Sequence, residues 1–99
     1  MYARVTQLQA DPRNIDTGVA GFRNDLLPAA RAAGGFKGAL LMVDRETGKT
    51  IGLTLWESEE ASERGGDAVR AARESTIRAI GETAIPEVQL YEVVVADGI

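Results

Sequence analysis

The stretch that decides the fold is GFKGALLMVDRETGKTIGLTLW, residues 35–56. Two apolar runs flank a short polar segment that ends in glycine, which is typical of a β-hairpin with a loop of roughly four to five residues. Asp44 is favoured at the first position of a turn, and Gly48 suits the left-handed position that closes it. We therefore expect strands over 36–44 and 50–57, joined by this turn.

A strand and a helix are expected before the hairpin. Residues 2–9 alternate between two faces and contain β-formers, which predicts a strand. Apolar side chains recur at helical spacing over 14–33, and Gly34-Gly35 stops that helix. Pro28 lacks a backbone donor, so the helix should kink or break over residues 24–27.

A helix and a last strand are expected after the hairpin. Ser58 is a natural N-cap for a helix over 59–80 that Gly81 ends. Gly65-Gly66 lies inside this segment, and glycine is unfavourable in a helix interior, so we expect a bend or two short helices there. The last strand is predicted over 87–96.

The element order is then β-α-β-β-α-β, the ferredoxin-like pattern of an α+β fold. We expect a single domain over 1–99, with one four-stranded antiparallel sheet and both helices on one face. The first hairpin strand offers apolar side chains to both sides, with Phe36, Leu40 and Met42 on one of them. Because two helices cover only one face, the other face needs a partner, and a second copy is the simplest one. The sequence thus predicts a homodimer through the sheet face.

Composition sets limits on partners and location. The chain has 99 residues, 44% hydrophobic and 26% charged, with a formal net charge of −4. This acidity argues against nucleic acid or an anionic membrane as the main partner. No apolar run approaches the roughly 18 residues that span a bilayer. The N-terminal residues lack the layout of a signal peptide, so we expect a cytoplasmic protein.

Two absent residue types restrict the chemistry. The sequence contains no cysteine, which removes thiolate nucleophiles and Cys-ligated metals. It also contains no histidine, which removes His-based triads and the usual haem, zinc and non-haem iron sites. We therefore expect neither a metal nor another cofactor. The alternative is a hard-cation site made of oxygen ligands alone, for which the sequence has no EF-hand-like spacing. Any chemistry must use the remaining polar side chains or the ligand itself.

The candidate pocket residues are Trp56, Arg4, Thr6, Thr54 and Tyr91. Trp56 either fills core space or forms a stacking wall of a pocket between two sheets. Arg4 and Thr6 share a strand face and would meet Thr54 and Trp56 if the first and third strands are neighbours. A buried Arg4 needs a partner or an anionic ligand, and the alternative is that it reaches solvent at a sheet end. Tyr91 is either a packing residue or a proton donor, and no catalytic residue can be assigned.

Four segments resemble one family: Gly35–Leu40, Asp44–Gly48, Leu55–Ala61 and Leu90–Val93. The resemblance is to the dimeric α/β-barrel proteins of the antibiotic-biosynthesis-monooxygenase (ABM) type, and it spans nearly the whole chain. Family members include cofactor-free oxygenases acting on polyketide-like aromatics and haem-degrading enzymes. The oxygenases tend to carry an asparagine on the strand that holds the tryptophan, and this chain has none there. The histidine of the haem-degrading members is also missing, which disfavours haem degradation.

Two functions follow from this resemblance and from the residues. The first is a cofactor-independent monooxygenase-like oxidoreductase acting on small aromatic or polyketide-like molecules, with Trp56 and Arg4 orienting the substrate. The second is a non-catalytic dimeric module that binds a small apolar or aromatic ligand or serves in a stress response. An enzyme needs a positioned proton acceptor or oxyanion donor in its cavity, and this requirement separates the two.

Overall fold

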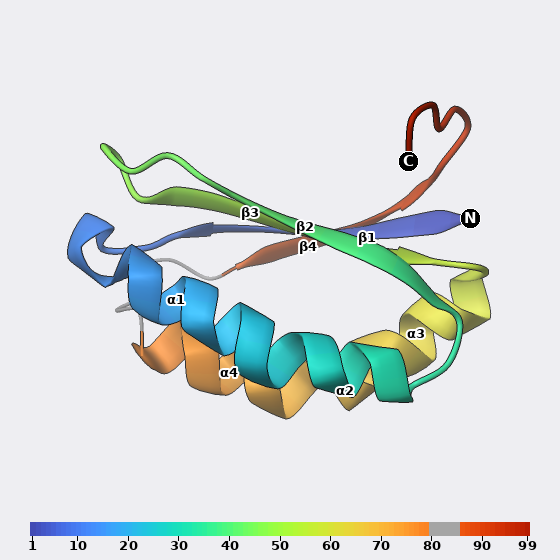
Figure 1. The fold of residues 1–99 in the computed structure, drawn as a ribbon, viewed down its shortest axis with the longest axis horizontal. Helices are drawn as coiled ribbons and strands as arrows, with labels where there is room; N and C mark the ends of the chain where they lie inside the picture. The colour runs from blue at the N-terminus through green and yellow to red at the C-terminus, as the bar shows by residue number, and fades with distance from the viewer. Residues whose placement is uncertain (80–85) are drawn as a thin grey trace.

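The computed structural model describes residues 1–79 and 86–99. One antiparallel sheet has the strand order β2-β3-β1-β4, with β1 (Tyr2–Gln9), β2 (Phe36–Val43), β3 (Lys49–Trp56) and β4 (Glu87–Glu92). Four α-helices lie against one face of this sheet (Figure 1): α1 (Ile15–Gly21), α2 (Leu27–Ala32), α3 (Glu59–Ala68) and α4 (Arg70–Ala79). The predicted ferredoxin-like α+β fold is confirmed.

The hairpin turn has the predicted chemistry. The Asp44 carboxylate accepts hydrogen bonds from the backbone N–H groups of Glu46 and Thr47, at 3.0 and 3.3 Å. Gly48 has a φ of +82°, and a Cβ there would also overlap the carbonyl oxygen of Ala10. Glycine is therefore required at this position both by backbone conformation and by space.

The first helical segment does not break over residues 24–27 as predicted, and its irregularity is a wider helical turn. A π-helical turn, η2 (Phe22–Leu26), joins α1 to α2, and the two helices continue in line (Figure 1). The N–H of Leu27 donates to the Phe22 carbonyl, and Pro28 follows in the first turn of α2. The wider turn thus precedes the residue that has no N–H to donate. Positive φ angles at Gly34-Gly35 end the helix, as expected.

The second helical segment corrects a prediction. Ser58 caps α3 as expected, with its hydroxyl accepting from Ala61 N–H at 3.0 Å. The segment forms two short helices, as one of the two predicted alternatives had it, but the predicted position is wrong, because α3 continues through Gly65-Gly66 and the break comes at Val69. A Cβ on the first glycine would overlap the Trp56 indole, so the glycines serve close packing of α3 on the sheet. The predicted helix end at Ile80 and Gly81 lies outside the described residues.

The last strand is shorter than predicted. β4 ends at Glu92 instead of Ala96 because its partner β1 begins at Tyr2. Beyond that pair, the N–H of Val93 donates to the Met1 carbonyl at 2.9 Å. Residues 93–99 then leave the sheet on the side opposite the helices (Figure 1).

The predicted face of Phe36 is also wrong. The pairing of β2 with β3 shifts register between Phe36 and Gly38, so Phe36 lies opposite Trp56. Their rings meet edge to face, with centroids 5.5 Å apart. The irregularity turns Phe36 toward the helices, whereas Leu40 and Met42 stay on the open face, as expected.

Candidate functional site

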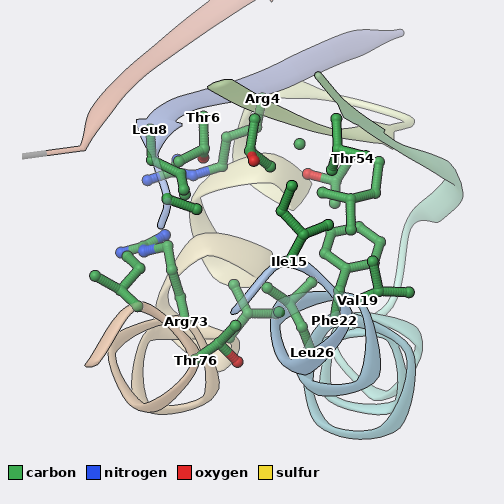
Figure 2. Close-up of a pocket in the computed structure, with 18 residues that line it drawn as sticks. Arg4, Thr6, Leu8, Ile15, Val19, Phe22, Leu26, Thr54, Arg73 and Thr76 are labelled. Atoms are coloured by element: carbon green, nitrogen blue, oxygen red, sulfur yellow. The ribbon is translucent and has the colours of Figure 1, made fainter. Parts of the chain in front are cut away.

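A cavity of about 80 Å³ lies between the sheet and the helices (Figure 2). Most of its wall is apolar. Large apolar side chains come from β1, β2, α1, η2 and α4: Leu8, Ile15, Val19, Phe22, Leu26, Leu41, Val43 and Ile77. The polar side chains on the wall are Arg4, Thr6, Thr50, Thr54, Arg73 and Thr76. An apolar wall with a few polar groups is the usual form of a small-molecule site.

Trp56 lies beside this cavity and is part of the packed core. Its exposed fraction is 0%, and it packs with Leu26, Ala30, Ala61 and Val69. The indole points toward α3, on the helix-covered face of the sheet. It therefore fills core space, and the alternative of a wall between two sheets is wrong because that space would adjoin the other face.

Thr54 connects Trp56 to the cavity. The indole Nε1–H donates to the Thr54 hydroxyl oxygen at 2.9 Å, and both side chains are buried. Because that oxygen accepts the hydrogen bond from the indole N–H, the O–H of Thr54 stays available as a donor, and Thr54 lies on the cavity wall (Figure 2). Trp56 thus orients one hydroxyl of the site.

Arg4 extends from β1 across the cavity wall, directly beside Thr6 and opposite Thr54 in the sheet. Its guanidinium packs so closely on α3 that a Cβ on Gly66 would come within 2.7 Å of Cζ. Its Nε is buried, and no hydrogen-bond partner for it occurs in the described part of the chain. Arg4 as a whole is half-buried, so the structure combines a buried Nε with partial exposure, and the alternative that Arg4 reaches solvent at a sheet end stays open.

Arg73 joins Arg4 and was missed by the sequence reasoning. Both guanidinium groups lie at the same side of the cavity (Figure 2). Burial, followed by the positive charges of Arg4 and Arg70, lowers the pKa of Arg73, and Glu74 partly offsets this. The group stays protonated because an arginine pKa is so high. A signal was present in the sequence, since Arg73 is four residues after the buried Val69 and shares its helix face.

Tyr91 lies away from the other candidates. It pairs with Ala3 across the sheet, on the face opposite to Arg4, and its exposed fraction is 50%. The structure therefore brings Arg4, Thr6 and Thr54 to one wall, places Trp56 behind Thr54, and leaves Tyr91 on the open face.

The described cavity wall carries no carboxylate, tyrosine or amide side chain. Over residues 1–79 and 86–99, no three acidic side chains gather in a way that could hold a metal ion. In the same residues no helix combines the length and apolar character needed to cross a membrane. The chemical groups of the site are therefore two guanidinium cations and four hydroxyls.

Comparisons with known proteins place the fold. No family model matches the chain. The uncharacterized protein Rv2557 of Mycobacterium tuberculosis is 36% identical over 93 residues, which is 94% of this chain. The chain spans about two fifths (41%) of the length of that relative.

Two solved structures resemble this one throughout. A monooxygenase from the gene ActVA-Orf6 of Streptomyces coelicolor, in complex with nanaomycin D, has a TM-score of 0.79 and 21% identity, over 97% of this chain and 89% of that one. SnoaB, a cofactor-independent oxygenase from Streptomyces nogalater, has a TM-score of 0.72 and 14% identity, over 99% and 97%. The chain has the fold of these ABM-type proteins, as the sequence resemblance implied.

Proposed function

We propose that the chain is a cofactor-independent monooxygenase-like oxidoreductase that acts on a small aromatic, polyketide-like molecule. The observation that carries the proposal is the cavity between sheet and helices, where cations and hydroxyl donors are set into an apolar wall. A fold shared with a monooxygenase and a cofactor-independent oxygenase supports it. In this proposal residues 1–99 act as one domain.

The cavity suits a substrate that ionises and then reacts with oxygen. The apolar wall would hold the aromatic rings and exclude water. The charge of Arg4 would lower the pKa of a phenolic or enolic hydroxyl nearby, and the Thr54 O–H would donate to the resulting anion. Such an electron-rich anion can react with O₂ directly. A methylene group between two aromatic rings would become a ketone, with one oxygen atom retained and the other released as water.

The second candidate is a non-catalytic module that binds a small molecule in the same cavity. The lack of a carboxylate or other neutral-pH proton acceptor on the described wall favours it. Under the first proposal the substrate must lose its proton to water, whereas under the second no proton is lost.

Oxygen consumption separates the two candidates. We expect uptake with anthrone-like substrates or aromatic diols, formation of the oxidised product, and the same rate with and without a chelator. Arg4→Met should lower the rate, whereas Arg78→Met, an exposed position on α4, should not. No uptake across such substrates would favour the binding module. Loss of uptake with chelator would instead require a metal.

We also propose that the protein is a homodimer through the open face of its sheet. This face carries the exposed side chains of Leu40 and Met42, at 54% and 47%, together with Tyr91. Exposed apolar side chains of this kind mark an interaction surface, and a two-fold axis would pack the same surface of two copies together. Residues 93–99 leave the sheet on the same side and carry exposed Val94 and Val95. Light scattering at micromolar concentration should give twice the 10.5 kDa chain mass, and a stable monomer would contradict the proposal.

A further inference from the structure

The arginine pair of the cavity has an unusual charge environment. Arg4 and Arg73 lie close enough that the charge of the first helps to lower the pKa of the second. Neither forms an ion pair or a side-chain hydrogen bond with a described residue, and the Arg4 Nε is buried without a partner. Two partly buried cations side by side are unfavourable unless an anion joins them.

Acidic residues are plentiful elsewhere in the chain. Asp and Glu number 15 against 11 Lys and Arg. Three exposed arginines have acidic partners: Arg13 with Asp11, Arg45 with Asp16, and Arg70 with Asp67. A scarcity of carboxylates therefore does not explain why the described cavity wall has none.

We propose that the cavity binds an organic carboxylate, with the carboxylate group held between Arg4 and Arg73. Guanidinium groups bind carboxylates through paired, charge-assisted hydrogen bonds. The apolar body of the ligand lies against Ile15, Val19 and Phe22, which face the pair across the cavity (Figure 2). The inference rests on the proposed function only in taking this cavity as the ligand site, and it specifies that the substrate is an acid.

Binding of a matched pair of ligands tests the inference. Calorimetry compares 2-naphthoate with 2-naphthamide, which has nearly the same shape but no charge, and with inorganic phosphate alone. We expect the carboxylate to bind at least about 10-fold more tightly than the amide. Phosphate should bind more weakly than the carboxylate because it gains nothing from the apolar wall.

Arginine variants show whether the charge contrast comes from the pair. Arg4→Met and Arg73→Met each keep an apolar stem of similar length, and each should weaken carboxylate binding by about 10-fold or more. Amide binding should stay the same. Arg78→Met, on the same helix but exposed, should change neither. Arg73→Lys keeps the charge without the planar fork, so its carboxylate affinity should be intermediate.

Thermal melts without ligand separate a binding role from a structural one. Removing an unpaired, partly buried charge should leave the melting temperature of Arg4→Met and Arg73→Met unchanged or higher. A ligand role predicts this combination of weaker binding and undiminished stability. If both variants melted lower and still bound 2-naphthoate normally, the arginines would be structural and the inference would be wrong.

Three further results would overturn the inference. Equal affinity for 2-naphthoate and 2-naphthamide would show that charge is not recognised. Phosphate binding as tight as that of 2-naphthoate would make the site one for inorganic anions. Oxygen uptake with neutral aromatics but no binding of carboxylates would refute the inference and leave the proposed function standing. Carboxylate binding at the pair without oxygen uptake would support the inference and contradict the proposed oxygenase function.

Discussion

The two faces of the sheet differ from the usual pattern in opposite ways: the covered face holds a few polar side chains among apolar ones, and the open face exposes apolar side chains. The covered face, under the helices, carries Arg4, Thr6 and Thr54. The open face, away from the helices, carries Leu40 and Met42. A sheet with one solvated face would normally have apolar residues inside and polar residues outside. The proposed functions follow this division, with a ligand in the cavity of the covered face and a second copy on the open face.

The covered face is itself uneven. Near its β3 end the Trp56 indole fills the space up to α3, and Gly65 brings the helix backbone against the ring. Farther along the strands, Thr54 and Gly52 present small groups to the helices, and the cavity lies there. The region between the sheet and the helices therefore contains both the packed Trp56 side chain and the cavity beside it.

Removing the Trp56 side chain should cause the largest loss of stability. Trp56→Ala deletes a fully buried indole and its hydrogen bond to Thr54. We expect a loss of about 3–5 kcal/mol in the free energy of unfolding, measured by denaturant titration. A midpoint close to that of the unchanged protein would mean that the covered face does not depend on this residue.

Charging the open face should break the assembly and leave the fold intact. Leu40→Lys would place an ammonium group in the proposed interface, and we expect dimer affinity to fall about 100-fold, or about 2.7 kcal/mol. Ala20→Lys, an exposed position on α1, is the matched control and should change nothing. Sedimentation over a concentration series measures both. If the Leu40 variant stayed as dimeric as the control, the open face would not be the interface.

A smaller loss is expected where α3 meets Trp56. In Gly65→Ala the new methyl group would overlap the indole of Trp56, and relaxation of the packing should cost about 1–3 kcal/mol. Trp56→Phe in the same chain removes the ring atoms involved, so the two substitutions together should cost less than their sum. Strict additivity of the two losses would show that Gly65 is needed for another reason.

The hairpin was predictable because its signals are local. Asp44 and Gly48 form the predicted turn with their own backbone neighbours. The face of Phe36 was not predictable, since the register shift that turns it inward comes from pairing with β3. The role of Gly65 depends likewise on Trp56, which lies on a different element. A turn can therefore be predicted from neighbouring residues, whereas packing depends on residues from another helix or strand.

The site follows the same division. The sequence analysis placed Arg4 near Thr54 on the condition that the first and third strands are neighbours. The structure pairs Arg4 with Thr54 in the register of β1 with β3. Arg73 comes from α4, and its helix had to be placed over the sheet before its charge could be set beside Arg4. Tyr91 was grouped with the others on residue type, but strand parity puts it on the other face.

We expect the smallest loss of stability from a substitution in the hairpin turn. There the Asp44 carboxylate has hydrogen-bond partners, whereas the cavity arginines have none among the described residues. Hydrogen bonds from the backbone N–H of Glu46, then that of Thr47, lower the pKa of the Asp44 carboxyl below its ordinary value of 3.8. A lowered pKa in the folded state means that the charge stabilises the protein above the unfolded-state pKa. This contribution is lost as the pH falls through the lower, folded-state value.

Asp44→Asn keeps an oxygen acceptor and removes the charge. The variant should therefore be slightly less stable than the unchanged protein near neutral pH, and the difference should shrink as the pH falls below about 4. Denaturant titrations of both proteins over the same pH series measure the difference, in which the titration of other acids cancels. At each pH the variant and the unchanged protein should bind the ligand equally well, since the turn lies outside the cavity wall. A stability difference that stayed constant into acid would show that the hydrogen bonds of the turn stabilise it without help from the charge.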